Sequence, residues 1–330
     1  MSQPVTVQGI RIHRHGGPEE LRLEGFDLPP PGEGQVRVRH RASGVNFIDI
    51  HHRTGRYPLT DFPVVLGMEG AGTVDALGPG VPGLRVGQRV AYAGHSPGSY
   101  SEAFNVPAAL LVPLPDDIPE QQAAALMVKG LTAQYLLRRV YPVRAGETML
   151  VHAAAGGVGL ILCQWARHLG ATVIGTVSSA EKAELARAHG CDHTIIYTRE
   201  DFVARVRELT GGAGVPVVYD SVGQDTFHGS LECLQPCGLL ASFGTASGPI
   251  PPFDLFRLNK LGSLFVTSAS LFTYTAQPAM LAESARELFD LVRQGVIRVD
   301  VSRALPLAQA AQAHRLLGER QTTGATILLP

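Results

Sequence analysis

The sequence predicts an α/β protein that joins a β-rich part to a doubly wound parallel sheet of six strands. Three observations support this expectation. Before about residue 119, apolar and polar residues alternate with period two, which is typical of strands with one exposed face. Beyond it, short apolar runs alternate with helical segments, as in parallel sheets with helical crossovers. A glycine-rich turn follows the first of these runs.

The β-rich part begins with two alternating stretches, "VTVQGIRIH" at 5–13 and "QVRVRHRA" at 35–42. In the second stretch, Val36 and Val38 alternate with polar side chains. Clusters of Gly and Pro separate the stretches, and no run with a helical period appears before residue 119. We therefore expect a twisted, barrel-like antiparallel fold without a helix in this part.

The second part begins with a predicted helix at 119–140, in which Pro119 lies in the first turn. Six apolar runs follow, and helices are expected between the first five. The runs lie at 148–153, 171–177, 193–197, 215–220, 238–244 and 262–268. From about 277 the pattern predicts an amphipathic helix, then a short helix near 307–318 and a last strand at 324–330. That strand resembles the first part of the chain and is expected to return to it.

Composition limits the class of protein and of partner. The chain has 330 residues, of which 45% are apolar and 17% charged, and its formal net charge is −1. Its length and apolar content suffice for the hydrophobic core of one large domain or of two domains of ordinary size. Its net charge predicts neither nucleic acid nor an anionic membrane as partner. No apolar run approaches the roughly 18–20 residues of a membrane span, and the first residues lack the apolar region of a signal peptide. We expect a cytoplasmic protein.

The four cysteines lie in the second half of the chain, at Cys163, Cys191, Cys233 and Cys237. A disulfide framework is not expected in a cytosolic chain of this size. The spacing of Cys233 and Cys237 would allow a metal or redox pair. Because no second Cys/His pair lies nearby, we expect small buried residues instead.

The glycine-rich turn "AAGGVG" at 154–159 is the most informative motif. It lies between an apolar run and a helical segment, with Gly156, Gly157, Val158 and Gly159 at its centre. Glycines let the backbone approach a pyrophosphate, and the following helix offers free N–H groups and the positive end of its dipole. The turn therefore predicts a dinucleotide site.

The residues after the next apolar run predict which dinucleotide binds. Enzymes that use NAD usually place an acid about 20 residues after the turn, where it binds the ribose 2′-hydroxyl. Here Ser178 occupies that region, Lys182 follows one helical turn later, and Glu181 lies beyond the strand end. Tyr197, at the end of the third run, could flank the same phosphate. Hydroxyl and ammonium groups suit a 2′-phosphate, so we expect NADPH in preference to NADH.

The stretch "VVLGMEGAGTV" at 64–74 is similar to the start of a zinc alcohol dehydrogenase site. In those enzymes a His precedes the Glu and binds the metal, but here Met68 takes that place. A thioether is a poor ligand for Zn²⁺. The sequence therefore indicates either lost activity or chemistry without a metal.

The stretch "GETMLVHAAAGGVGLILCQWAR" at 146–167 resembles the quinone oxidoreductase/zeta-crystallin group, which comprises zinc-independent members of the medium-chain dehydrogenase/reductase superfamily. "GVNFIDIHHRTGRYP", "KGLTAQYLL", "VVYDSVGQDTF", "GSLFVTSASL" and "TTGATILLP" are similar to corresponding segments of bacterial NADPH:quinone reductases. The resemblance covers nearly the whole chain.

The resemblance implies two domains and a homodimer. A GroES-like catalytic domain would comprise 1–126 and 270–330, and a Rossmann domain 127–269. Two copies would pair through the last Rossmann strand, near 262–268. Where the zinc branch has a Cys and a His, this chain has Val45-Asn46 and Met68, so no metal is expected.

The resemblance also implies the site residues. The nicotinamide of NADPH would lie near Asn46, Phe47, Asp49 and Thr132. The rest of the cofactor would contact Val222, Gly244, Thr245, Ser270 and Leu271. The quinone would contact Asn46, Tyr57 and Tyr92, with Asn46 and Tyr57 as hydrogen-bond partners of its oxygen.

One position departs from the bacterial relatives, which often carry Tyr where this chain has His51. An imidazole that titrates near pH 6.5 could donate a proton to the reduced oxygen, or it could simply be solvated.

Three functions remain open at this point. The leading one is reduction of a small-molecule quinone by NADPH, in steps of one or two electrons. The second is reduction of the C=C bond of an α,β-unsaturated ketone or aldehyde. The third is a non-catalytic NADPH- or RNA-binding protein of crystallin type, although no Arg/Lys-rich stripe favours RNA.

Overall fold

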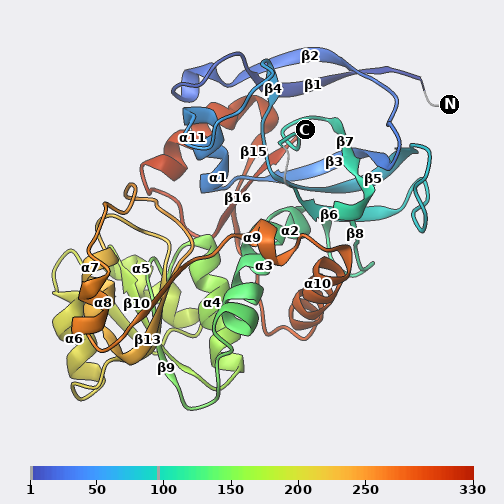
Figure 1. Cartoon of the computed structure of the whole chain (residues 1–330). Helices are drawn as coiled ribbons and strands as arrows, with labels where there is room; N and C mark the ends of the chain where they lie inside the picture. Colours follow the sequence, from blue (N-terminus) through green and yellow to red (C-terminus); the bar gives the residue numbers. More distant parts are fainter. Residues whose placement is uncertain (1–2, 95–96) are drawn as a thin grey trace. The chain divides into compact units, whose positions relative to one another are not determined.

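The structure is a computed structural model that describes residues 3–94 and 97–330. The chain forms two compact units (Figure 1). The first unit comprises Met1–Leu131, Thr275–Arg293 and Val299–Pro330, and the second comprises Thr132–Tyr274 and Gln294–Arg298. We propose that these units correspond to the two domains expected from the sequence.

The first unit contains two sheets of mostly antiparallel strands. One has the order β2-β1-β4, and the other has the order β15-β16-β3-β5-β6-β8, with β7 also paired to β3. Their bounds are β1 Val5–Ile12, β2 Arg22–Leu28, β3 Gln35–Gly44, β4 Val64–Val65, β5 Glu69–Leu77, β6 Arg89–Ala93, β7 Ala103–Pro107, β8 Val112–Pro113, β15 Val301–Pro306 and β16 Ala325–Leu329. The expected β-rich part is confirmed.

Strand β3 is buried more completely than the alternating pattern predicts. Val36 and Val38 are fully buried, as expected, but Arg37 between them is only 2% exposed. Its guanidinium donates to the carbonyl oxygens of Gln3 and Pro29, at 3.1 and 3.2 Å. A buried arginine therefore replaces the expected exposed face at this position, with one guanidinium nitrogen bonded to backbone oxygens while its buried Nε has no hydrogen-bond partner in the described residues.

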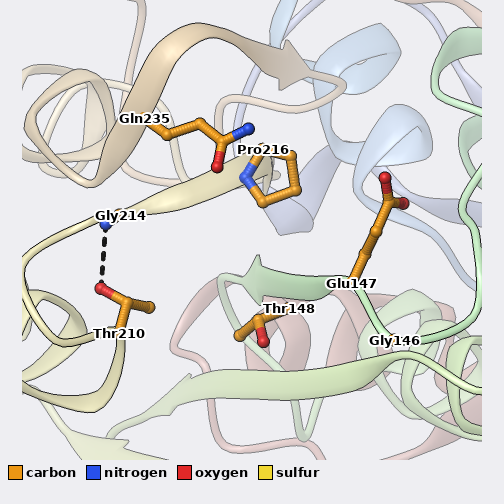
Figure 2. Close-up of a pocket in the computed structure, with 7 residues that line it drawn as sticks. All are labelled: Gly146, Glu147, Thr148, Thr210, Gly214, Pro216 and Gln235. Carbon is orange, nitrogen blue, oxygen red and sulfur yellow. Dashed lines mark hydrogen bonds between the residues drawn. The ribbon is translucent and has the colours of Figure 1, made fainter.

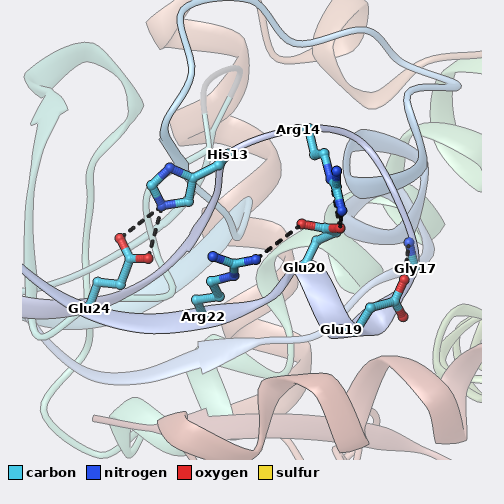
Figure 3. Close-up of polar contacts among 7 residues, drawn as sticks. All are labelled: His13, Arg14, Gly17, Glu19, Glu20, Arg22 and Glu24. Carbon is cyan, nitrogen blue, oxygen red and sulfur yellow. Dashed lines mark hydrogen bonds and ion pairs between the residues drawn. The ribbon is translucent and has the colours of Figure 1, made fainter.

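Several ion pairs lie along the connection between β1 and β2 (Figure 3). The 3-10 helix η1, Pro18–Glu20, carries Glu20, which accepts from Arg14 Nε at 2.9 Å. His13 contacts Glu24 at 2.9 Å on the neighbouring strand. Because the basic partner in each pair is largely exposed to solvent, we expect each pair to contribute little stability, and we assign them no function.

The expectation of no helix before residue 119 is wrong. Helix α1 spans Phe47–Thr54, and a further 3-10 turn, η2, spans Ala108–Leu110. Asp49 in the first turn of α1 accepts the backbone N–H of Asn46 at 2.8 Å, and Gly55 ends the helix at φ 80°. These are ordinary signals for the start and end of a helix, but eight residues are too few to establish a helical period.

The helix expected at 119–140 is divided. Helix α2 spans Glu120–Ala124, α3 spans Met127–Tyr135, and a π-helical turn, η3, covers Leu136–Val140. Pro119 precedes α2 instead of lying in its first turn. The break coincides with a tighter turn in which Leu126 N–H donates to Ala123 O at 3.0 Å.

The second unit is a six-stranded parallel sheet with the order β11-β10-β9-β12-β13-β14. The strands are β9 Thr148–Val151, β10 Thr172–Val177, β11 His193–Ile196, β12 Val215–Asp220, β13 Leu234–Ser242 and β14 Phe265–Ser268. The helices are α4 Gly157–His168, α5 Ala180–Ala188, α6 Phe202–Leu209, α7 Phe227–Glu232, α8 Phe256–Lys260 and α9 Leu271–Tyr274. Each predicted run overlaps one strand, so the doubly wound sheet is confirmed, with its order reversing between β9 and β12.

The chain then returns to the first unit, as expected. Helix α10 spans Pro278–Arg293, and α11, Ala310–Gly318, follows the 3-10 turn η4, Leu307–Gln309. Strand β16 pairs with β3, where Ile327 lies opposite Gly44. Within the described ranges, no helix has the length and apolar character needed to cross a membrane.

Candidate functional site

The turn after β9 leads directly into the N-terminus of α4. Ala153 adopts φ 52°, and Gly156 then caps the N-terminus of α4. The first helical bond joins Leu160 N–H to Gly156 O, so the N–H groups that precede Leu160 have no helical acceptor. A Cβ on Gly159 would lie 2.3 Å from Ala153 O, so only glycine lets the helix pack against the turn here.

A buried hydrogen-bond network fixes this turn to its neighbours. His152 contacts Thr176 Oγ1 and Ser230 Oγ, both at 2.9 Å, and Ser230 donates to Asp220 at 3.0 Å. Asp220 in turn accepts the N–H of Val222 at 2.8 Å. Burial lowers the pKa of His152, which favours the neutral ring. The network links the carboxyl ends of β9, β10 and β12, and sequence reasoning missed it.

The residues expected to bind the 2′-phosphate lie on adjacent segments at the ends of β10 and β11. Tyr197 N–H donates to Val177 O at 3.1 Å, which places Tyr197 beside Ser178. Ser179 caps α5 through the N–H of Lys182 at 3.3 Å, so Lys182 lies in the first turn of that helix. The ring of Tyr197 remains 42% exposed.

The other residues expected to bind the cofactor in this unit follow the carboxyl ends of β12, β13 and β14. They are Val222, Gly244, Thr245, Ser270 and Leu271. Ala269 N–H donates to Ser242 O at 2.9 Å, which joins the segments after β13 and β14. The buried hydroxyl of Thr245 has no hydrogen-bond partner in the described part of the chain, as expected of a group that contacts a ligand. Thr132, on α3, is 7% exposed.

In the first unit, Asn46 lies in a ring of hydrogen bonds at the start of α1. Its Nδ2 donates to Glu69 Oε2 at 2.7 Å, and its Oδ1 accepts from Lys129 Nζ at 2.8 Å. Lys129 also contacts Glu69 at 3.2 Å. Sequence reasoning missed Glu69 and Lys129, although both lie in the quoted motifs "GMEG" and "KGLT".

Asp49 departs from its expected role. The side chain is fully buried, and its Oδ2 accepts from Asn46 N at 2.8 Å and from the Tyr100 hydroxyl at 2.9 Å. Its burial argues against contact with the nicotinamide, and its two hydrogen bonds give Asp49 the role of fixing the start of α1, while its Oδ1 has no hydrogen-bond partner in the described part of the chain. Burial raises the pKa of Asp49 to about 7.

The raised pKa of Asp49 predicts a pH-dependent contribution to stability. Between about pH 4 and pH 7 the folded chain binds more protons at this carboxyl than the unfolded chain does, so its contribution falls as pH rises. We expect the difference in Tm between the native protein and Asp49→Asn to shrink from about pH 5 to about pH 7.5.

The control is Asp117→Asn, because the Arg293 guanidinium lowers the pKa of Asp117. Its difference in Tm should be small and should stay nearly constant from about pH 5 to about pH 7.5, because a carboxyl with a lowered pKa is ionised in both the folded and the unfolded chain there. A difference for Asp49→Asn that is constant or grows with pH would contradict the assignment.

An aromatic cluster follows Asn46. The ring of His51 lies 6.5 Å from that of Phe47 and 5.2 Å from that of Tyr57, measured between centroids. Tyr57 is 44% exposed, and its expected contact with substrate stays a prediction. Burial, aided by the nearby Arg56 charge, lowers the pKa of His51 to about 4. The expectation that His51 titrates near pH 6.5 is therefore wrong.

A neutral His51 should not act as a titrating acid. We expect His51→Phe to keep kcat within about threefold of the native value and to leave its pH profile between about pH 6 and pH 8 unchanged. Steady-state kinetics with one quinone would test this, with His13→Phe as a surface control. A tenfold loss of kcat at unchanged NADPH affinity would restore the proton-donor role.

Tyr92 lies in the core and does not face a substrate. It is 2% exposed among Val36, Val74 and other apolar side chains. Its hydroxyl lies 2.8 Å from His40 Nε2. The expected contact with the quinone is contradicted, because the ring of Tyr92 packs in the core and its hydroxyl is hydrogen-bonded to His40.

Met68 and Val45 pack in the core, at 1% and 3% exposure. In the described ranges, no group of three or more His, Cys, Asp or Glu side chains is arranged to hold a metal ion. Cys233 is buried, as expected, but Cys237, which lies in β13 with φ 59°, is exposed.

A separate hollow of about 310 Å³ lies at the amino ends of strands of the parallel sheet, whereas the glycine turn follows a carboxyl end (Figure 2). It is lined by Gly146, Glu147, Thr148, Thr210, Gly214, Pro216 and Gln235. Thr148 and Pro216 are at the amino ends of their strands, and Thr210 Oγ1 already accepts from Gly214 N at 3.0 Å. This hollow is therefore distinct from the residues around the glycine turn.

Comparison with known proteins gives consistent matches. A model described as "Alcohol dehydrogenase GroES-like domain" matches residues 32–116, and one described as "Zinc-binding dehydrogenase" matches 157–288. The chain is 52% identical to a quinone oxidoreductase of Pseudomonas aeruginosa, over 97% of this chain and 99% of the relative. It is 47% identical to a 2-haloacrylate reductase of Burkholderia sp., over 98% of this chain and 99% of the relative. The crystal structure of Escherichia coli quinone oxidoreductase complexed with NADPH resembles this structure with a TM-score of 0.96. The two sequences are 47% identical, and the match covers 99% of this chain and 100% of that chain.

Proposed function

The chain belongs to the quinone oxidoreductase group of the medium-chain dehydrogenase/reductase superfamily, and from this premise we propose that it reduces quinones with NADPH. The observation that carries the proposal is the glycine turn at Gly156–Gly159, together with Ser178 after β10, in place of an acid, and Lys182 in the first turn of α5. NADPH supplies the hydride when it is bound.

The residues of the chain have complementary tasks in this proposal. The free N–H groups at the start of α4 bind the pyrophosphate, while Ser178, Lys182 and Tyr197 bind the 2′-phosphate. In the first unit, Asn46 and the hydroxyl of Tyr57 donate hydrogen bonds to the quinone oxygen that gains negative charge. A quinone is already a strong electrophile, so we propose that no metal takes part.

A second candidate is reduction of a C=C bond conjugated to a carbonyl or carboxyl group. It is favoured by the 47% identity to a protein named 2-haloacrylate reductase. A third is binding of NADPH without turnover. The unpartnered buried hydroxyl of Thr245 supports binding of a ligand under all three candidates. Only the identity of the substrate that accepts the hydride can therefore distinguish them.

The test follows oxidation of NADPH and of NADH with four acceptors. These are 1,4-benzoquinone, 9,10-phenanthrenequinone, a simple enone and 2-chloroacrylate, each with and without EDTA. Quinone turnover with NADPH that is indifferent to EDTA supports the proposal. Turnover only of the enone or 2-chloroacrylate moves the protein to the second candidate, and NADPH binding without any turnover moves it to the third. Inactivation by EDTA would overturn the metal-free mechanism.

We also propose that two copies pair through β14. This strand is at the edge of the sheet, and unpaired edges are templates for pairing. Phe265 on β14 is 61% exposed, and Leu255 and Phe256 nearby in sequence are 71% and 57% exposed. Large exposed apolar side chains of this kind often mark an interface.

Phe265→Glu is expected to convert a dimer into a monomer, because the charge would be buried without a partner at the interface. Light scattering coupled to size exclusion would measure the mass of each form. The control is Tyr57→Glu, which places the same charge on an exposed aromatic position of the first unit. A native protein that is monomeric, or a variant that stays dimeric, would contradict pairing through this strand.

A further inference from the structure

The hydrogen bonds around Asn46 form a closed ring of three side chains. Lys129 donates to Asn46 Oδ1 at 2.8 Å, Asn46 Nδ2 donates to Glu69 at 2.7 Å, and Lys129 contacts Glu69 at 3.2 Å. Glu69 Oε1 also accepts the backbone N–H of Val128 at 2.8 Å. Glu69 is fully buried, and Lys129 and Asn46 are 6% and 7% exposed. The ring is therefore held away from solvent.

The chemistry of the ring leaves one orientation for the carboxamide of Asn46. An ammonium group can only donate hydrogen bonds, and an ionised carboxylate can only accept them. Oδ1 must therefore face Lys129, and Nδ2 must face Glu69. The opposite orientation would set N–H against ammonium and oxygen against carboxylate, which leaves buried charges unsatisfied.

The same arrangement strengthens the second N–H of Nδ2 as a donor. An ammonium bound to Oδ1 polarises the amide, and hydrogen bonds in a chain reinforce one another at low dielectric. The backbone of Asn46 is fixed as well, because its N–H donates to Asp49 Oδ2 at 2.8 Å. Gly44 leaves the space for Glu69, since a Cβ there would lie 2.2 Å from Glu69 Oε2.

We propose that Lys129 is a positioning residue, which together with Glu69 orients and polarises Asn46 so that its free amide N–H meets the oxygen of the reduced substrate. This inference rests on the proposed function, because Asn46 is the group that touches substrate there. Lys129 acts through Asn46 and transfers no proton itself.

The competing explanation is that the Lys129–Glu69 pair only stabilises the fold. The variants Lys129→Met and Lys129→Met/Glu69→Gln separate the two explanations. The single variant leaves a buried carboxylate without its cation, which is strongly destabilising, whereas the double variant removes both charges at similar volume. A structural role predicts that stability and kcat recover together in the double variant. A positioning role predicts that stability recovers while kcat does not.

We expect the double variant to regain most of the native Tm while its kcat stays about 10- to 100-fold low, the scale of a donor misplaced by about 1 Å. The Kd of NADPH, from its fluorescence, should stay within about twofold of native. The matched control is Arg89→Met/Glu120→Gln, which removes a 2.8 Å ion pair of the same unit away from Asn46. Its kcat should stay within about twofold.

A second readout is independent of turnover. In a ¹⁵N-labelled protein, the Asn46 Nδ2 proton that bonds to Glu69 should exchange slowly with solvent and should be shifted downfield, and Asn46→Asp would assign the two side-chain amide signals by their loss. In the double variant this proton should shift upfield and exchange rapidly. Recovery of kcat together with Tm, or unchanged Asn46 signals, would overturn the inference. If the native protein turns over no acceptor, the proposed function fails, and with it the catalytic part of the inference, while the amide signals still decide whether Lys129 orients Asn46.

Discussion

Replacing Gly159 by alanine is expected to abolish measurable NADPH binding. The new Cβ would lie 2.3 Å from Ala153 O and 2.8 Å from Ala154 Cα, and both are backbone atoms that no rotamer change can move away. Helix α4 would have to shift, together with the N–H groups at its start that we assign to the pyrophosphate. A shift of this kind should raise the Kd of NADPH by at least about 100-fold, because several charge-assisted hydrogen bonds depend on one geometry.

Titration of NADPH fluorescence would measure this effect, and circular dichroism would show whether the sheet is intact. The control is Gly318→Ala, where the new Cβ would meet nothing closer than Ile50 Cδ1 at 3.9 Å. Gly318→Ala should bind NADPH as the native protein does. Native affinity in Gly159→Ala would show that the turn does not hold the pyrophosphate.

The arrangement of the parallel sheet was predictable from sequence because its strands are buried runs separated by helices. Six runs matched six strands, and the glycine turn lies after the first, where its position between a strand and a helix makes its spacing informative. Helix α1 was missed for the opposite reason. Its apolar residues, Phe47, Ile48 and Ile50, are too few to distinguish a helical period from the alternation of the surrounding strands.

The candidate site in the first unit shows a different limit. Lys129 and Asn46 are 83 positions apart, and no local pattern predicts that their side chains meet. Asp49 and Tyr92 had suitable chemistry for a site, but the fold buries both. Residue type can therefore nominate a functional group, whereas burial and partners, which depend on the tertiary structure, decide whether that group can reach a ligand.

Lys182→Glu is expected to reverse the preference between the two nicotinamide cofactors. Lys182 lies in the first turn of α5, directly after Ser178 at the end of β10. We assign its ammonium to the 2′-phosphate, which only NADPH carries. Loss of one charge-assisted hydrogen bond costs about 2 kcal/mol, or about 30-fold in affinity, and the repulsion of a carboxylate adds to it. The kcat/KM for NADPH should fall by at least about 30-fold, while that for NADH should change by less than about threefold.

The control for this reversal is Arg187→Glu, which makes the same charge change later on the same helix. Arg187 pairs with Thr194 Oγ1 at 2.7 Å and with Glu184, and it lies in the last turn of α5, away from Ser178. If the electrostatic field of the helix alone set the preference, both variants would weaken NADPH. If Lys182 binds the phosphate directly, only Lys182→Glu should do so. Equal losses for NADPH and NADH in Lys182→Glu would instead indicate damage to the turn, and would leave Ser178 and Tyr197 as the groups that distinguish the two cofactors.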